Sequence, residues 1–170
     1  SNNLKTPLGP IGTFVNGVPL FGPEDGFSWQ NKKIWNRNAI VAEAISFDSC
    51  LGHPQMTGVY HYHQIPNCLQ VQLGDDGSGH SPIIGWAFDG YPIYGPYGYD
   101  DPMDASSAVR RLDSGYQPRF GMVQRDTLPD GTQLPPNLWG PNVSNQYPLG
   151  LYIEDHAFTG GGDLDPFNGR

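Results

Sequence analysis

Charged side chains are scarce in this sequence. They make up 15% of the 170 positions, against about 25% in a typical domain. The 17 acidic residues outnumber the 9 basic ones, which gives a formal net charge of −8. Because nucleic-acid binding depends on lysine and arginine contacts to phosphates, this balance argues against a nucleic-acid partner.

Long hydrophobic runs and helical periodicity are also lacking. No stretch approaches the roughly eighteen consecutive apolar residues of a transmembrane helix, so we expect no membrane span. No long stretch places helix-forming residues at the helical period either. The best helical candidate, residues 35–45, includes Asn36, Asn38, Ile40 and Val41, and is equally compatible with a strand.

Glycine, proline and aromatic residues, by contrast, are abundant. The 23 glycines and 17 prolines make up 40 of the 170 residues, and another 21 are aromatic (8 Phe, 9 Tyr and 4 Trp). Disordered chains lack so many aromatic rings. The combination predicts a single domain spanning residues 1–170. We expect it to be all-β or β-dominated α+β, with few short helices and many turns.

Several features favour an exported protein, whether secreted, periplasmic or on the cell surface. Although no signal peptide begins at Ser1, other features point to export. Lysine is rare, Tyr, Trp and Asn are common, and Asn142 opens a glycosylation sequon. The two cysteines, Cys50 and Cys68, do not form a CxxC motif. We expect them to form a disulfide, the alternative being two reduced, buried thiols.

An internal repeat joins two segments that lie 73 positions apart. Residues 11–23 read IGTFVNGVPLFGP and residues 84–96 read IGWAFDGYPIYGP, with six of thirteen positions identical. Asn-Gly or Asp-Gly between apolar runs favours a tight hairpin turn, so each copy is predicted to be a hairpin. Pro19 and Pro92 lack an N–H group, so each second strand should lie at an edge or carry a bulge. We therefore expect two related β-rich halves from an internal duplication.

The second half ends before its expected counterpart of the histidine-rich segment in the first. Residues 164–170 align with residues 47–53, so that Asp165 matches Asp48 and Gly169 matches Gly52. The counterpart of the histidine-rich segment would then lie beyond Arg170. We expect the C-terminal part of the domain to be missing or carried by a second chain, in an extracellular assembly. Residues 100–136, rich in turn signals, are predicted to be an insertion loop.

The candidate chemistry centres on residues 58–63, which read Gly-Val-Tyr-His-Tyr-His. Alternate side chains of a strand share a face, so His61 and His63 should project to one side. Tyr60 and Tyr62 should project to the other. Two imidazoles placed in this way can converge on one metal ion.

A third ligand is expected from another histidine. His53 and His80 are the first candidates, and His156 is a further one. If the two cysteines pair, the covalent ring encloses His53 together with the pair at positions 61 and 63. Such a ring would restrict the ligand geometry before a metal arrives.

Imidazole and carboxylate ligands suit copper and zinc, and we expect copper first because Cu(II) heads the divalent affinity series. The neighbouring Tyr60 and Tyr62 also suit copper better than calcium. Glu43 and Asp48 are candidate additional ligands or acceptors that orient the imidazoles. Copper would permit redox chemistry, whereas zinc would acidify a bound water, with Glu43 as a general base.

Other roles for the motif stay open. His61 or His63 can act as an acid or base without a metal, oriented by Asp48 or Asp89. Asp89-Gly90, however, is more typical of a turn. The strand can instead form a hydrogen-bonded structural layer. Whether the protein is an enzyme is therefore left open.

Calcium is a further alternative, at the C-terminal end of the chain. Asp163, Asp165 and Asn168 supply alternating oxygen ligands there. The segment lacks the bidentate glutamate of an EF-hand loop, and Pro166 interrupts the pattern.

A non-catalytic binding module is the alternative function. Aromatic side chains can form a surface for carbohydrate or protein partners, although in a Gly-rich β domain most rings should pack in the core. We expect residues 97–99 to be the most exposed part. The candidate rings are Trp29, Trp35, Trp86, Trp139, Tyr91, Tyr94, Tyr97 and Tyr99.

Several of these segments resemble the YHYH-domain family. The matching segments are residues 35–54, 58–69 (GVYHYHQIPNCL), 80–99 (HSPIIGWAFDGYPIYGPYGY), 162–165 and 168–170. The resemblance covers nearly the whole chain except residues 100–136. It implies an exported, mostly bacterial protein of unsettled biochemistry. Members usually continue past the positions that match residues 168–170.

Overall fold

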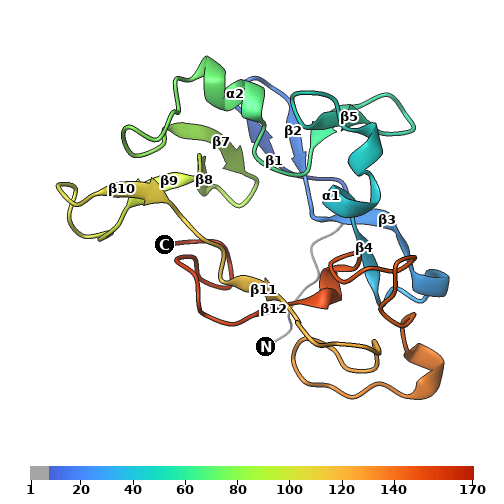
Figure 1. Cartoon of the computed structure of the whole chain (residues 1–170). Coiled ribbons are helices and arrows are strands. Elements are labelled where there is room, and N and C mark those ends of the chain that lie inside the picture. The colour runs from blue at the N-terminus through green and yellow to red at the C-terminus, as the bar shows by residue number, and fades with distance from the viewer. Residues whose placement is uncertain (1–7) are drawn as a thin grey trace. The chain divides into compact units, whose positions relative to one another are not determined.

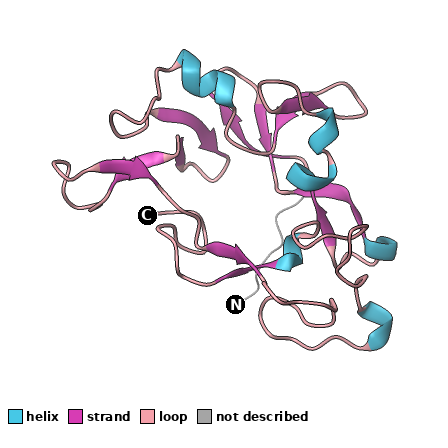
Figure 2. Ribbon diagram, viewed as in Figure 1, coloured by secondary structure: helices cyan, strands magenta, loops and turns pink. Residues whose placement is uncertain are grey.

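A computed structural model of the chain describes residues 8–170. It contains twelve short strands and two short α-helices among these residues, connected mainly by loops (Figures 1 and 2). The predicted β-dominated fold with few helices is therefore confirmed. None of the helices in this range is long and apolar enough to cross a membrane.

The chain forms two compact units, each made from two separate segments. The first unit contains the chain up to Gly22 together with Ile45–Leu112. The second contains Pro23–Ala44 together with Asp113–Arg170. The family resemblance runs through both units, and a single domain over residues 1–170 stays a prediction.

A six-stranded sheet organises the first unit, in the order β5-β6-β2-β1-β7-β8. Neighbouring strands are antiparallel except β2 and β6, which are parallel and pair at Leu20 and Tyr62. A two-stranded sheet, β9–β10, and the helix α2 complete the unit. The bounds are β1 Pro10–Phe14, β2 Pro19–Phe21, β5 Gly52–Pro54, β6 Tyr60–Tyr62, α2 Asn67–Gln72, β7 Ile83–Ala87, β8 Pro92–Tyr94, β9 Tyr97–Tyr99 and β10 Val109–Arg111.

The two predicted hairpins are present and have the same backbone pairing. Gly12 pairs with Leu20 in β1–β2, and the equivalent Gly85 pairs with Ile93 in β7–β8. Each hairpin has its register shift immediately before this glycine. The expectation for the prolines holds for Pro92, because β8 ends the sheet, but it is wrong for Pro19: β2 lies between β6 and β1, and the extra residue of the irregularity is in β1.

The central pairing of the sheet is symmetric between the hairpins. Gly12 of β1 lies opposite Ala87 of β7, and Phe14 lies opposite Gly85. A Cβ on Gly12 would lie 2.7 Å from the carbonyl oxygen of Trp86, and one on Gly85 would lie 2.7 Å from that of Thr13. Both positions therefore need glycine for the same close approach of strands.

The Asp48 and Asp165 turns match each other as the sequence alignment predicts. The Asp48 side chain accepts from the amides of Cys50 and Gly52, and the Asp165 side chain accepts from the amides two and four positions later. Leu51 and the equivalent Asn168 both have positive φ, 68° and 60°. These parallels support the predicted duplication, which stays a prediction.

The core of the first unit lies on the tyrosine side of the histidine-rich strand. Phe14, Tyr62, Leu69 and Ile84 are its buried residues. The edge of the Phe14 ring meets Tyr62, with ring centroids 5.5 Å apart. Burial of Tyr62 therefore fixes which face of β6 its histidines occupy.

The second unit has two two-stranded sheets, β3–β4 and β11–β12, and the short helix α1. Trp35, Leu134 and Tyr152 form its apolar core. Beside this core, the buried guanidinium of Arg125 donates two hydrogen bonds to the Asp155 carboxylate, both of 2.7 Å. The bounds are β3 Glu24–Ser28, β4 Asn36–Asn38, α1 Ala39–Ala42, β11 Tyr116–Pro118 and β12 His156–Phe158. Short 3₁₀ turns span Trp29–Asn31, Ala44–Ser46, Pro136–Leu138 and Ile153–Asp155.

Three local expectations are refined by the structure. Residues 35–45 contain both alternatives, a strand (β4) followed by a helix (α1). Residues 100–136 are not loop throughout, because they include β10 and β11; an insertion there stays a prediction. Tyr97 and Tyr99 are half-buried. Four aromatic residues of the β7–β8 hairpin are more exposed than these two, namely Trp86, Phe88, Tyr91 and Tyr94.

Candidate metal centre

The β5–β6 hairpin brings three histidines together. His53 of β5 lies directly opposite His61 of β6, and His63 follows two residues after His61. Cross-strand partners and alternate residues of one strand share a face, so all three imidazoles project to the same side. The predicted alternation of histidines and tyrosines along residues 60–63 therefore holds.

The three imidazoles converge on one small volume. The Nε2 atom of His61 lies 3.0 Å from Nε2 of His53 and 3.0 Å from Nε2 of His63. One nitrogen from each ring lies within 4.8 Å of the others. The exposed fractions are only 5% for His53, 3% for His61 and 8% for His63, so water competes little for these nitrogens.

Backbone carbonyls fix the tautomers of two of the rings. Nδ1 of His61 lies 3.1 Å from the carbonyl oxygen of Val59, and Nδ1 of His63 lies 2.6 Å from that of Gly22. A carbonyl oxygen can only accept, so each Nδ1 carries the hydrogen. In a neutral ring the opposite nitrogen, Nε2, is then an unprotonated lone pair. The 3.0 Å contact between His61 and His63 therefore joins two lone pairs, which repel each other unless a cation lies with them.

The third ring is held by a hydroxyl group. Nδ1 of His53 lies 2.7 Å from Oγ of Ser46. A hydroxyl can donate or accept, so His53 can present Nε2 either bare or protonated. In the protonated form it can donate to His61, whereas the contact between neutral His61 and His63 rings has no hydrogen.

Burial disfavours a proton on two of the three rings. Burial lowers the pKa of His53, and the nearby His61 lowers it further. Burial also lowers the pKa of His61, against a smaller opposite effect of the Val59 carbonyl. Both rings therefore favour the neutral form, which is the form that binds metal ions.

Aromatic rings hold the imidazoles from outside. Phe21 of β2 stacks on His61, with ring centroids 4.0 Å apart and an angle of 24° between the planes. The edge of Phe47 packs against His53 at 4.7 Å. These contacts restrict ring rotation and exclude water from the cluster.

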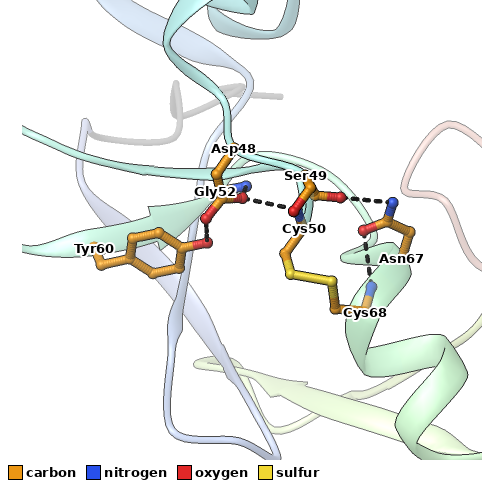
Figure 3. The surroundings of a disulfide bond; sticks show 7 residues. All are labelled: Asp48, Ser49, Cys50, Gly52, Tyr60, Asn67 and Cys68. Carbon is orange, nitrogen blue, oxygen red and sulfur yellow. Dashed lines mark hydrogen bonds between the residues drawn. A yellow bond between two sulfur atoms is a disulfide. The ribbon is translucent and has the colours of Figure 1, made fainter.

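The predicted disulfide is present (Figure 3). It closes a covalent ring of the chain that contains the cluster. Cys50 and Cys68 are joined with their Cα atoms 5.0 Å apart, and all three clustered histidines lie in the ring between them. Asn67 strengthens this closure by donating to the carbonyl of Ser49 at 2.9 Å. The Cys50 side of the ring leads directly into β5, so the bridge restrains where His53 can lie.

Asp48 organises the same turn through contacts to a tyrosine hydroxyl and two backbone amides. Its carboxylate accepts the Tyr60 hydroxyl at 2.7 Å and the amides of Cys50 and Gly52 (Figure 3). These hydrogen bonds, Tyr60 first, lower the pKa of Asp48. Tyr60 and Tyr62 cover Gly52 on the side away from the histidines, where a side chain at Gly52 would clash. These contacts hold the turn in place. The roles predicted for Asp48, Tyr60 and Tyr62 beside a metal stay predictions.

The remaining predicted ligands lie elsewhere. His80 is exposed, with its ring edge against Tyr94 at 5.3 Å, and does not belong to the three-histidine group. His156 begins β12 in the second unit. Glu43 also belongs to the second unit, where burial and Asp25 raise its pKa and Arg37 lowers it.

The other predicted functional positions have local roles. Asp89 accepts the amide of Tyr91 at 3.3 Å and Gly90 has a φ of 94°, as expected of a turn. Among the predicted calcium ligands, Asp163 accepts a hydrogen bond from the amide of Asp113, and Asp165 accepts one from the amide of Phe167 in its own turn. Asn168 lies in that turn with positive φ. Asn142 of the sequon is exposed.

Five residues around the cluster escaped the sequence reasoning: Gly22, Val59, Ser46, Phe21 and Phe47. Two act through backbone carbonyls, which no side-chain motif reveals. Gly22 and Phe21 reach the cluster only because β2 pairs in parallel with β6, a contact between distant parts of the chain. For Ser46 and Phe47 the sequence offers one signal, which is their position directly before the Asp48 turn.

Comparisons with known proteins give one match. No curated protein and no solved structure matches the chain. A family model described as "YHYH protein" matches residues 1–170, which is the whole sequence. The predicted resemblance is confirmed, and the chain belongs to the YHYH protein family.

Proposed function

We propose that this protein binds one transition-metal ion through His53, His61 and His63. The contact that supports this most directly is the 3.0 Å approach of Nε2 of His61 to Nε2 of His63, two rings whose Nδ1 atoms each face a backbone carbonyl. Neutral imidazoles with hydrogen-bonded Nδ1 atoms are the usual form of metal-binding histidine. A cation at the convergence of the three rings would turn a repulsive arrangement into a favourable one.

Copper is the first choice of metal and zinc the second. All three donors are imidazoles, which suit both metals, and copper heads the divalent affinity series. A three-histidine zinc site, however, is also a known catalytic arrangement. Bound copper would supply redox chemistry, and bound zinc would supply an acidified water. The chain's own contribution is to hold three neutral donors in place behind Phe21 and Phe47.

An exported location accompanies this proposal. A disulfide persists in oxidising compartments and is rare in the reducing cytosol. The exposed sequon at Asn142 and the scarcity of lysine agree with that location.

The test is metal content and affinity of untagged, natively purified protein. We expect one equivalent of copper or zinc per chain, and tighter binding of copper when both compete. The His61→Ala/His63→Ala double variant should lose the metal while keeping its disulfide and its circular dichroism spectrum. His80→Ala is the matched control, because His80 lies outside the cluster, and it should retain full binding. Equal metal content in the double variant and the control would contradict the proposal.

A non-catalytic binding module is a second candidate function. Its support is the exposure of Trp86, Phe88, Tyr91 and Tyr94 on one hairpin. Exposed aromatic groups of this kind are typical of interaction surfaces. Glycan-array or pull-down binding that survives the His61→Ala/His63→Ala substitutions would favour this function over the metal site.

A further inference from the structure

Strand β8 is the structural counterpart of β2, and the two differ in what lies on their outer side. In the first hairpin, β6 pairs with β2 in parallel, at Leu20 and Tyr62. In the second hairpin the residue equivalent to Leu20 is Ile93, as the shared glycine pairing shows. Within residues 8–170 no strand pairs with β8 on that side, so β8 ends the sheet.

The side chains beside β8 are correspondingly more exposed than those beside β2. In the first hairpin Phe21 is half-buried, because the His61 ring of β6 stacks on it. The residue equivalent to Phe21 is Tyr94, which makes a T-shaped contact with the His80 ring at 5.3 Å and stays 44% exposed. Trp86 and Tyr91 on the same hairpin are 48% and 72% exposed. An edge strand surrounded by exposed rings is a typical site for the addition of another strand.

The backbone after β8 also repeats that of β2. The amide of Gly22 donates to the carbonyl of Gly9, and the amide of the equivalent Gly95 donates to that of Pro82. In the first hairpin the Gly22 carbonyl accepts Nδ1–H from His63. The carbonyl of Gly95 occupies the equivalent backbone position, so a strand placed like β6 would find an acceptor there.

We propose that β8 is a docking edge for an extended strand of a partner polypeptide. The strand pairs in parallel about Ile93, as β6 pairs about Leu20, and places a planar side chain such as imidazole over Tyr94. Its pattern alternates aromatic and imidazole residues, as residues 60–63 do. Main-chain hydrogen bonds supply affinity, and the ring beside β8 supplies selectivity. This inference is independent of the metal proposal.

The probe for this edge is a synthetic peptide with the sequence of residues 57–65, added to the full chain in the presence of a chelator. The chelator removes any contribution from a shared metal ion. We expect saturable binding by calorimetry, with amide chemical-shift changes centred on residues 92–95. Absence of saturation at millimolar peptide overturns the proposal. So do shifts centred on β2, because they would mean exchange with the chain's own β6.

Two controls separate strand pairing from general attraction to exposed rings. Tyr94→Ala should raise the dissociation constant about tenfold, since it removes the ring that the added strand covers. Tyr91→Ala changes a ring on the same hairpin that is not at the position equivalent to Phe21. It should leave the dissociation constant of the peptide unchanged. An N-methylated peptide cannot pair as a strand and should not bind. Equal losses in the two variants, or binding of the methylated peptide, overturn the proposal.

Discussion

The tautomers of His61 and His63 are set by backbone carbonyls rather than by the carboxylates that the sequence suggested. Val59 and Gly22 supply these carbonyls, at 3.1 and 2.6 Å. His-x-His alone therefore predicted that the two imidazoles share a face, and their role as metal ligands stays a proposal. It could not predict the proton positions, because these depend on how the neighbouring strands fold.

Ser46 gives the sharpest single-residue test of ring orientation. Its hydroxyl lies 2.7 Å from Nδ1 of His53 and is the hydrogen-bonding partner of that nitrogen. Groups that orient a metal-binding histidine typically contribute about 10–100-fold to metal affinity. We expect Ser46→Ala to weaken binding within this range, measured by competition with a chelator of known affinity. Ser49→Ala, an exposed serine three residues later, is the control, and an equal effect of both changes would contradict this role.

Asp48 predicts a pH effect that is separate from the histidines. The Tyr60 hydroxyl and two amides lower the pKa of Asp48 below its usual 3.8. A lowered pKa in the folded state means that this stabilisation is present above pH 3.8 and is lost as the pH falls through the folded-state value. Tyr60→Phe removes the largest cause, so the Asp48 titration should move to higher pH. Carboxyl carbon chemical shifts measure this directly, and an unchanged titration would show that Tyr60 does not hold the carboxylate.

The hairpins are the elements that the sequence predicted best. The Asn-Gly and Asp-Gly turns between apolar residues predicted the β1–β2 and β7–β8 hairpins, and both hairpins are present. The parallel pairing of β2 with β6 could not be foreseen, because it joins segments 42 residues apart through one residue pair, Leu20 and Tyr62. That pairing completes the cluster, since it brings Gly22 and Phe21 to the imidazoles.

The disulfide supports the β5–β6 element as a whole. Cys50 and Cys68 are separated by 18 residues, and closing such a loop stabilises the folded state by about 3 kcal/mol in the chain-entropy model. We expect Cys50→Ser/Cys68→Ser to lower the free energy of unfolding by about this amount in denaturant titrations, and to weaken metal binding as well. Asn67→Ala removes the hydrogen bond to the Ser49 carbonyl and the one accepted from the Cys68 amide, and should cost about 1–2 kcal/mol. A double cysteine variant no less stable than Asn67→Ala would contradict a structural role for the bridge.

At the scale of the whole molecule, composition predicted the fold class but not the division into units. Many turns and rings indicated a β-dominated fold, and this is what the structure contains. Each unit, however, is assembled from two chain segments, and the three crossings, after Gly22, Ala44 and Leu112, carry no linker composition. The single domain and the duplication rest on sequence patterns that extend through both units.

The placement of all three histidines in the first unit predicts how a defect in the second unit affects the site. Arg125 and Asp155 are fully buried, and removing one partner of such a pair costs about 3–5 kcal/mol. We expect Arg125→Ala to lower the free energy of unfolding of the second unit by this amount. Below its unfolding transition, the variant should still bind one metal ion per chain. Arg111→Ala, at an exposed position, should change neither property, and loss of metal from folded Arg125→Ala protein would contradict this separation.

The most direct measurement of the central claim is anomalous diffraction from crystals of the natively purified protein, recorded at the copper and zinc absorption edges. Coordination by three imidazoles predicts one strong peak, at about 2.0–2.1 Å from the Nε2 atoms of His53, His61 and His63. The sign of the difference between the two edges identifies the metal. A peak only at another position such as His80, or well-ordered imidazoles with no peak after incubation with both metals, would contradict the account.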